Sequence, residues 1–496
     1  MAETNPAVRS DGDFPLADPN ELSMRFFVTC VVVFAAVLFV WKAVLVLSNP
    51  HFGGDAAVRM LNAGRPIARM GNRVWLPYLQ LQIFGLARFE VPYAFFNLIP
   101  CVHLFIAALG LGLLGLRFLG RSRQSLLIIL AFMLCFAQQP VMAHTSTMLY
   151  QEITGTALFY LLLYGGALEL SKRRWLLAAG AVALLARDSM WIYLLALTAV
   201  NAKKILADSV YRRAFLFLWA IPPLWLIAVL CGWPVFNGRM PTLPTEWPLM
   251  INKQGNQAVS SLAASIQHLW DSAFRSRFVY LAAGGIAAWI VYLVESRRKQ
   301  PRSVPPAAFA RLLKPFTLLS LGICYGLIFL FDPWQHTAGS GRIFAAAIEQ
   351  SFVWLLLIAA ALRACRTPAK IIAAVALLAG AASGVDPRID RWIPVQNPGK
   401  VEAYEEIAAW IDNAAPGRKP MACMIGDHFA EMSDFSAAIY RASHKILPPD
   451  ISRVPDACDA LYTTQARIPP DTGGLMRAKE YTIDAERFVL YLRPGF

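Results

Sequence analysis

A carboxylate and four arginines lie within one short stretch of the sequence, residues 51–77. Asp55 follows two glycines just after a long apolar run, and the basic residues are Arg59, Arg65, Arg69 and Arg73. Arginine side chains bind phosphate oxygens through paired N–H groups. The pattern therefore indicates an anionic headgroup, such as a phosphate group, held near Asp55. Two plainer interpretations stay open: Asp55 as a helix cap, and the arginines as a solvated or lipid-facing basic surface.

Further charged residues lie at or inside other apolar runs. Glu152 opens one run, Arg187 and Asp188 separate two short runs, Arg342 precedes another, and Glu349 lies within it. Ionisable residues in membrane segments face a cavity or a partner and are functional by default. Each also has a structural alternative: a charge favoured by the helix dipole for Glu152, a neutral ion pair for Arg187 and Asp188, an interfacial position for Arg342, and pairing with a neighbouring helix for Glu349.

Histidines and acidic residues offer few metal ligands. His51 with Asp55, and Asp332 with His336, have the i, i+4 spacing that places two side chains on one helix face. Two ligands do not define a metal site, so a divalent metal stays an open alternative and no other cofactor is indicated. His144, near the end of another apolar run, is a candidate cavity residue or cap.

Cysteine and glycine spacings exclude two common cofactor sites. The eight cysteines include no C-x-x-C or Cys/His pattern typical of zinc. Cys423 and Cys458 lie in a polar region and are a candidate disulfide in an oxidising compartment. Gly110, Gly112 and Gly115 have G-x-G-x-x-G spacing inside an apolar run, so we expect close helix packing there and not a dinucleotide loop.

The elements that position these residues are membrane helices. The chain has 496 residues, of which 57% are hydrophobic and 16% charged, whereas soluble domains average about 45–50% and about 25%. Its apolar runs reach or approach the ~20 residues that cross a bilayer. We therefore predict a polytopic α-helical membrane protein with about eleven transmembrane helices, at residues 26–48, 91–117, 125–142, 151–170, 175–187, 189–200, 214–231, 277–294, 315–331, 343–362 and 370–385.

The charge pattern predicts an orientation and excludes nucleic acid as a partner. The net charge is +14, but nineteen lysines and arginines lie in the loops that are cytoplasmic if the N-terminus is, whereas the outer loop 143–150 has none. This asymmetry follows the positive-inside rule, while a nucleic-acid-binding protein gathers basic residues on one soluble face. We expect a cytoplasmic N-terminus, longer outer loops at 49–90 and 232–276, and an outer C-terminus.

The two ends of the chain differ in character from the apolar middle. Residues 1–22 read as a polar cytoplasmic tail, residues 23–385 as the transmembrane domain, and residues 386–496 as a small extracytoplasmic α/β domain. In the last region Val401–Asn413 has helical spacing, and Met421–Ile425, Ala457–Thr463 and Phe488–Leu492 are typical of strands.

These features resemble the membrane-embedded GT-C glycosyltransferases, in particular the bacterial branch similar to protein O-mannosyltransferases and lipid A sugar transferases. The resemblance rests on one amino-proximal span, the early Asp55 of the first outer loop, and the sequence GNRVWLP at 71–77. It covers the architecture of the whole chain, although each motif is short.

The resemblance implies a function and roles for the residues named above. Asp55 is implied as the general base, Glu152 matches an acidic residue of the family, Arg187 and Asp188 match a charged pair, and Arg342 matches an arginine that meets the donor phosphate. The implied reaction moves a sugar from a polyprenyl-phosphate donor to a hydroxyl of a glycan, lipid or protein acceptor, with inversion at the anomeric carbon. A bacterial inner (plasma) membrane is the expected location.

Two other functions are compatible with an apolar chain that has a basic loop. One is a lipid-linked glycan transporter or flippase, although the two related halves common in transporters are not found in the sequence. The other is a non-catalytic assembly subunit that binds lipid-linked glycans and has no need of Asp55.

Overall fold

The structure is a computed structural model that describes most of the helical region and part of the C-terminal region. The described residues are 21–48, 97–147, 151–167, 175–187, 189–237, 267, 270–271, 273–274, 276–298, 308–335, 345–362, 367–385, 421–425, 443–447, 451–483 and 486–495.

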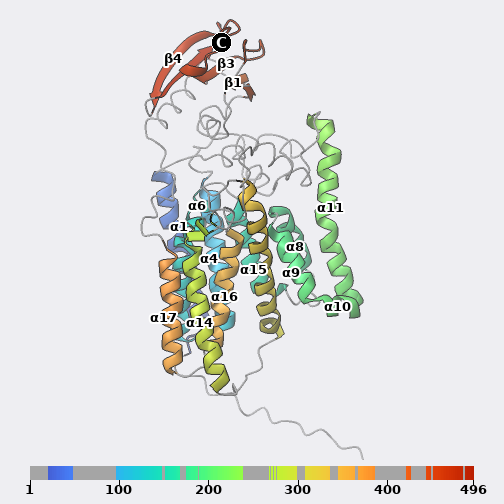
Figure 1. Cartoon of the computed structure of the whole chain (residues 1–496), viewed down its shortest axis with the longest axis vertical. Coiled ribbons are helices and arrows are strands. Elements are labelled where there is room, and N and C mark those ends of the chain that lie inside the picture. The colour runs from blue at the N-terminus through green and yellow to red at the C-terminus, as the bar shows by residue number, and fades with distance from the viewer. Residues whose placement is uncertain are drawn as a thin grey trace, which may run out of the picture.

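Most of the described residues are helical, and the longer helices stand side by side in a bundle (Figure 1). The helices are α1 (Met24–Ser48), α4 (Leu98–Leu119), α5 (Arg123–Gln138), α6 (Pro140–Thr145), α7 (Gln151–Tyr164), α8 (Trp175–Ala186), α9 (Ser189–Val200), α10 (Ala202–Ala207), α11 (Ser209–Asn237), α14 (Phe278–Arg298), α15 (Ala308–Gln335), α16 (Ala345–Leu362) and α17 (Thr367–Ser383).

Among the described residues, length and apolar composition qualify four helical segments to cross a membrane: Met24–Ser48, Leu98–Leu119, Phe278–Glu295 and Ala345–Leu362. Shorter apolar helices lie at Arg123–Gln138, Glu152–Tyr164, Leu176–Ala186, Met190–Val200 and Thr367–Ser383. These helices fit an integral membrane protein. Each of the eleven predicted segments contains a described helix, but the number that span the bilayer, and their orientation, stay predictions.

One predicted span, 125–142, is divided into two helices. α5 ends at Gln138 and α6 begins at Pro140, which lacks the N–H that would continue α5. The Gln139 side chain caps α6 by accepting hydrogen bonds from the N–H groups of Val141 at 2.7 Å and Met142 at 3.1 Å. Its amide also donates to the backbone oxygen of Ser276 at 2.7 Å. Hydrogen bonds of Gln139 therefore fix the break between α5 and α6, to α6 through the side-chain oxygen and to Ser276 through the side-chain nitrogen.

Three glycines let α4 pack closely against three neighbouring helices. A Cβ atom at Gly110 would lie 2.9 Å from Tyr160 on α7, one at Gly112 would lie 2.5 Å from Val31 on α1, and one at Gly115 would lie 2.7 Å from Ile129 on α5. No larger residue fits without movement, so the close helix packing predicted for these glycines is confirmed.

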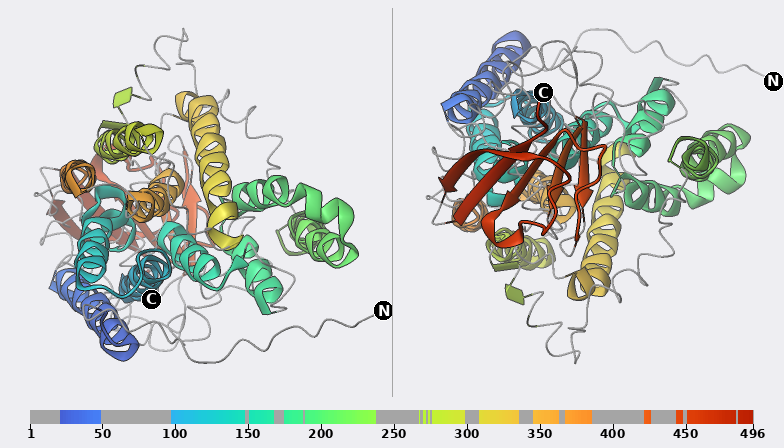
Figure 2. Two further views of the ribbon diagram at one scale, coloured as in Figure 1. Left: turned by 90° about the horizontal axis from the view of Figure 1, so that it is seen from below. Right: turned by 90° about the horizontal axis from the view of Figure 1, so that it is seen from above.

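The bundle has two distinct ends. α6 lies at the end nearest the C-terminal sheet and α10 lies at the opposite end (Figure 1). Because α6 connects α5 to α7, and α10 connects α9 to α11, the start of α7 and the turn between α8 and α9 belong to the end with the sheet. Seen along the bundle, the sheet lies across this end (Figure 2).

The C-terminal region contains a five-stranded sheet of order β2-β1-β3-β5-β4. β2, β1 and β3 pair in parallel, whereas β5 runs antiparallel to both β3 and β4. The strands are β1 (Met421–Ile425), β2 (Ser443–Leu447), β3 (Ala460–Thr464), β4 (Met476–Ile483) and β5 (Glu486–Leu492). The three predicted strands correspond to β1, β3 and β5 and are confirmed, and the predicted helix at Val401–Asn413 lies outside the described residues.

A disulfide joins Cys423 on β1 to Cys458, which precedes β3, with 5.7 Å between their Cα atoms. Both cysteines are fully buried in an apolar core that includes Val454, Leu461 and Val489. The disulfide therefore fixes the parallel part of the sheet.

Candidate functional site

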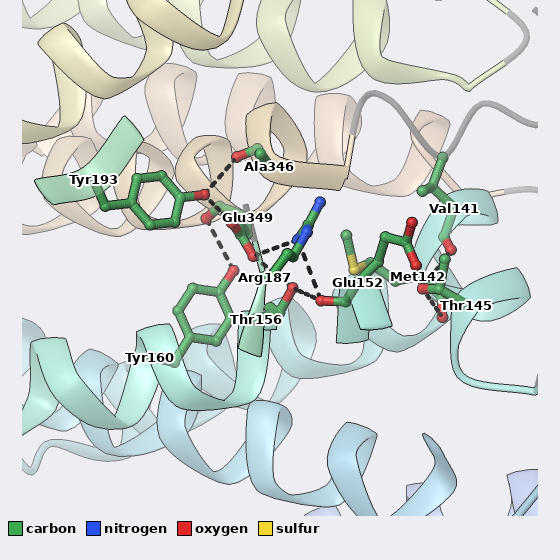
Figure 3. A network of polar contacts seen from close by, with 10 residues as sticks. All are labelled: Val141, Met142, Thr145, Glu152, Thr156, Tyr160, Arg187, Tyr193, Ala346 and Glu349. Atoms are coloured by element: carbon green, nitrogen blue, oxygen red, sulfur yellow. Dashed lines mark hydrogen bonds and ion pairs between the residues drawn. The ribbon is translucent and has the colours of Figure 1, made fainter. Parts of the chain in front are cut away.

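Three charged residues that the sequence singles out come together near the sheet end of the bundle. Glu152 lies in the first turn of α7, Arg187 lies between α8 and α9, and Glu349 lies in the second turn of α16. Figure 3 shows that hydrogen bonds and ion pairs connect them into one network.

Glu349 is the innermost member of the network and has 0% exposure. The Thr156 hydroxyl donates to its Oε2 at 2.5 Å, and the Tyr193 hydroxyl donates to its Oε1. The Tyr160 hydroxyl donates to the Glu349 backbone oxygen at 2.9 Å. Each carboxylate oxygen thus accepts a hydrogen bond, which is the condition under which a buried charge is tolerated.

Arg187 connects the inner carboxylate to the start of α7. Its Nη1 lies 3.9 Å from Oε2 of Glu349 and donates to the Glu152 backbone oxygen at 3.3 Å. The side chain is 8% exposed. Gly155 makes room for it, because a Cβ atom at that position would lie 2.7 Å from Cδ of Arg187. α7 therefore needs glycine where the guanidinium group crosses it.

Glu152 is the outer carboxylate of the network and differs from Glu349 in its bonding. It is 9% exposed, and its Oε2 has no hydrogen-bond partner among the described residues. Its side chain is turned away from Glu349 toward the residues of α6 (Figure 3). The first turn of a helix favours a negative charge, but a buried carboxylate oxygen without a donor is unfavourable. A hydroxyl group of a bound molecule would satisfy it.

The network therefore has two parts with different capabilities. Glu349, Thr156 and Tyr193 satisfy one another and hold Arg187 in place. Glu152 has acceptor capacity to spare, and a guanidinium group has five N–H donors, of which those on Nη1 make the contacts with Glu152 and Glu349. A hydroxyl acceptor and a phosphate donor are the chemical groups that this pair suits.

An apolar hollow of about 70 Å³ adjoins the network between α7, α8, α9, α11 and α15. Its lining includes Phe159, Leu163, Leu184, Leu218 and Phe316, together with the ring of Tyr193, whose hydroxyl reaches Glu349. An apolar hollow of this kind is suited to apolar groups. Tyr193 therefore connects the apolar lining of the hollow, to which its ring belongs, with the buried charge network, to which its hydroxyl belongs.

The structure describes only some of the other predicted site residues. His144 is a half-buried residue of α6, whose neighbours Val141, Met142 and Thr145 lie beside Glu152 in Figure 3. Within the described ranges no group of three or more His, Cys, Asp or Glu side chains forms a metal cluster. Asp55 and the remaining candidates lie outside the described residues: His51, Arg59, Arg65, Arg69, Arg73, Asp188, His336 and Arg342.

The sequence analysis missed the hydroxyl groups of the site. Thr156, Tyr160 and Tyr193 lie in apolar helices, where their side chains resemble ordinary core residues. The feature of the sequence that could have indicated them is that hydroxyl groups in membrane helices form hydrogen bonds with other helices. That signal does not identify the partner, because Tyr193 and Glu349 are 156 positions apart.

Comparison with known proteins gives one distant likeness. The sequence matches no protein-family model and no curated protein. Among solved structures, the chain is similar to the arabinofuranosyltransferase AftD from Mycobacteria, with a TM-score of 0.45 and 14% identity. The match covers 95% of this chain and 40% of that protein. At this score and identity, no residue role is carried over from it.

Proposed function

We propose that this protein is a membrane glycosyltransferase. It moves a sugar from a polyprenyl-phosphate donor to an acceptor hydroxyl on the extracytoplasmic side, with inversion at the anomeric carbon. The observation that carries the proposal is that two groups adjoin: Glu152, whose buried Oε2 has no partner among the described residues, and Arg187, whose Nη1 donates to the Glu152 backbone oxygen at 3.3 Å.

The proposed reaction is a single displacement. The acceptor hydroxyl loses its proton to Asp55, and its oxygen bonds to the anomeric carbon on the face opposite the phosphate. The bond from that carbon to the phosphate oxygen breaks, and polyprenyl phosphate leaves with the electron pair. Glu152 accepts a hydrogen bond from the acceptor and orients it, while Arg187, Arg342 and the arginines of the first loop stabilise the charge that develops on the phosphate.

Burial of the network supports a reaction that separates charge inside the protein. Electrostatic stabilisation is strongest where fixed donors face the developing charge and water is excluded. Arg187 has this character, because Glu349 fixes its position and both residues are almost completely buried. A guanidinium group held in this way needs little rearrangement when the phosphate departs.

The apolar hollow supports a donor that carries a hydrocarbon chain. It lies between membrane helices and ends at Tyr193, beside the Glu349 and Arg187 pair. A sugar nucleotide has no apolar part that would use such a surface, whereas a polyprenyl chain does.

The test is turnover of the purified full-length protein with a panel of polyprenyl-phosphate sugars and candidate acceptors. We expect release of polyprenyl phosphate by the native chain, no release by Asp55→Asn, and a decrease of about 10–150-fold in kcat/KM for Glu152→Gln, because a hydrogen bond to a charged group contributes about 1.5–3 kcal/mol. Glu21→Gln is the matched control, because Glu21 is a partly exposed carboxylate that pairs with Arg121. It should retain full activity.

Two results would contradict parts of the proposal. If Glu152→Gln released polyprenyl phosphate as fast as the native chain, Glu152 would have no role in the reaction. No release from any donor would reject the glycosyltransferase and favour a flippase or a non-catalytic binding subunit. The anomeric configuration of the product, measured by NMR, tests inversion independently.

A further inference from the structure

Lys42 is a fully buried cation in the first membrane helix. α1 turns Val33, Val40 and Val44 outward, each more than half exposed, and its opposite face is buried. Lys42 belongs to that buried face with 0% exposure. Its Nζ lies 4.6 Å from the centre of the Trp41 ring and has no hydrogen-bond partner among the described residues.

The surroundings of Lys42 are the start of α4 and the end of α6. Phe39, three residues before Lys42, packs against Phe105 of α4 with 6.5 Å between the ring centroids. Val31 lies against Gly112 of the same helix, so this antiparallel register places Lys42 level with Cys101 in the first turn of α4. The Cys101 thiol donates to the backbone oxygens of Asn97 and Ser146, each at 3.3 Å. Ser146 is the residue that follows α6. Lys42 therefore lies where two helix ends meet α1.

The start of α4 contributes backbone N–H donors beside the Lys42 ammonium group. The N–H groups of Leu98 and Ile99 open a helix of 22 residues and have no partner within it. Together with the helix dipole, such groups favour an anion. A buried ammonium group and a long helix N-terminus thus adjoin each other, and no acidic side chain of the described residues pairs with Lys42.

Burial favours loss of the Lys42 proton unless an anion is present. A buried ammonium group without a counter-ion carries a penalty of several kcal/mol, of which the Trp41 ring offsets only a part, and lysines near helix ends normally extend to the membrane surface and avoid it. Lys42 lies six residues before the end of α1, or about 9 Å along the helix axis, and its side chain is packed inward. A ligand that supplies a negative charge would remove the penalty.

Position in the bilayer favours a lipid headgroup as the source of that charge. α1 has 25 residues and is therefore about 37 Å long, whereas the hydrocarbon core measures about 30 Å. A helix of this length that crosses the bilayer has about 7 Å to spare, so its end reaches the headgroup region, and Lys42 lies about 9 Å before that end. Val40 and Val44, which flank Lys42, are exposed.

We propose that Lys42 and the start of α4 bind the phosphate group of a membrane lipid. The site is separate from Glu152 and Arg187, because it lies on the face of α4 that contacts α1. The opposite face of α4 contacts α7, where the His103 ring lies 2.8 Å from the Thr154 hydroxyl.

Binding is tested on the full-length protein in detergent, with native mass spectrometry to count bound molecules. Farnesyl phosphate is the probe, and farnesol and inorganic phosphate are the comparison ligands. The variants are Lys42→Met, which keeps the length of the side chain, and Lys42→Arg, which keeps the charge. Arg25→Met is the control, because Arg25 is an exposed cation at the opposite end of the same helix.

The native chain should carry one more farnesyl phosphate than Lys42→Met, whose affinity at this site should fall at least about tenfold. Lys42→Arg and Arg25→Met should bind as the native chain does, and farnesol should bind equally to all. Competition by inorganic phosphate would show that the headgroup alone suffices, whereas no competition would assign the site to the intact lipid. Equal farnesyl phosphate binding by Lys42→Met and the native chain would overturn the proposal.

Thermal unfolding separates ligand binding from a structural role of Lys42. Without lipid, Lys42→Met should melt at the same temperature as the native chain or higher, because a buried unpaired charge has been removed. A lower melting temperature would show that Lys42 is paired within the protein and would also overturn the proposal. The Lys42-dependent lipid should persist in Glu152→Gln, so failure of the transfer reaction does not decide this inference.

Discussion

At the scale of single residues, Glu349 and Glu152 show how two nearby carboxylates acquire different roles. Glu349 accepts hydrogen bonds from Thr156 and Tyr193 and lies near Arg187. Glu152 has an oxygen with no partner in the described structure. Changing the first should therefore affect mainly stability, whereas changing the second should affect acceptor binding and turnover with little effect on stability.

Glu349→Leu should lower the free energy of unfolding by about 3–5 kcal/mol, because Arg187 then stays buried without its counter-ion. Tyr193→Phe removes one hydroxyl and should lower it by only about 0.6 kcal/mol, and by at most about 1.7 kcal/mol. Unfolding by denaturing detergent measures both variants. Equal losses would show that the ion pair contributes nothing beyond an ordinary hydrogen bond.

Sequence reasoning identified Glu152, Arg187 and Glu349 one by one, because a charge in an apolar segment is conspicuous. It could not pair them, since residues 152 and 349 are far apart in the chain and the contact depends on how α7, α9 and α16 pack. Thr156 and Tyr193 could not be predicted as site residues for a different reason. Their hydroxyls are recognised as part of the site only when the carboxylate that they contact, Glu349, is known.

At the scale of elements, α14 and α17 approach one another through glycine. A Cβ atom at Gly284 would lie 2.7 Å from the backbone oxygen of Ala376 and 2.7 Å from Cα of Gly380. Both neighbours are backbone atoms and cannot rotate away. The two helices are thus held at a distance that only glycine permits, as in other close contacts of membrane helices.

Gly284→Ala should lower the free energy of unfolding by about 1–3 kcal/mol, because α14 and α17 must separate. Gly322→Ala in α15 is the matched control, since a Cβ atom there meets nothing within 4 Å. Alanine should stabilise that position by about 0.5–1 kcal/mol relative to glycine. The two variants should change the free energy of unfolding in opposite directions. No change in Gly284→Ala would contradict the close contact of α14 and α17.

Apolar runs predicted where the described helices lie, but local chemistry set their ends. Pro140 divides one run that hydropathy alone reads as continuous. In the sheet, β4 was missed because it is an edge strand whose residues Met476, Arg477 and Lys479 are exposed. An exposed edge lacks the alternation of apolar and polar residues by which strands are recognised.

At the scale of the whole molecule, the candidate site and the sheet share one end of the bundle, and α10 lies at the other (Figure 1). α10 and the start of α11 carry Lys203, Lys204, Arg212 and Arg213, all exposed. The positive-inside rule assigns such an end to the cytoplasm. The sheet is therefore expected outside.

Cysteine labelling in intact cells tests this orientation. Leu206 in α10 is 77% exposed and Met476 in β4 is 60% exposed, so a cysteine at either position is accessible. A maleimide that does not cross membranes should label Met476→Cys and leave Leu206→Cys unlabelled until the cells are permeabilised. The native chain measures background from its own cysteines. The reverse pattern would invert the orientation.

The disulfide should stabilise the sheet independently of the bundle. Replacing Cys423 and Cys458 together by serine should lower the stability of the sheet by about 2–4 kcal/mol, because the crosslink joins residues 35 positions apart. Hydrogen exchange should become faster in β1 and β3 and stay unchanged in α4 and α7. Equal exchange in both proteins would show that the core of the sheet is sufficient without the crosslink.

The Glu349 network also has a consequence for how the protein is made. Thr156 and Tyr193 are synthesised 193 and 156 positions before the carboxylate they bind, which at ribosomal speed is an interval of roughly 8–40 s. During that interval the carboxylate that pairs with Arg187 has not yet been synthesised. The network can therefore form only after α16 has been made, so the packing of α7 and α9 around Arg187 is completed late in synthesis.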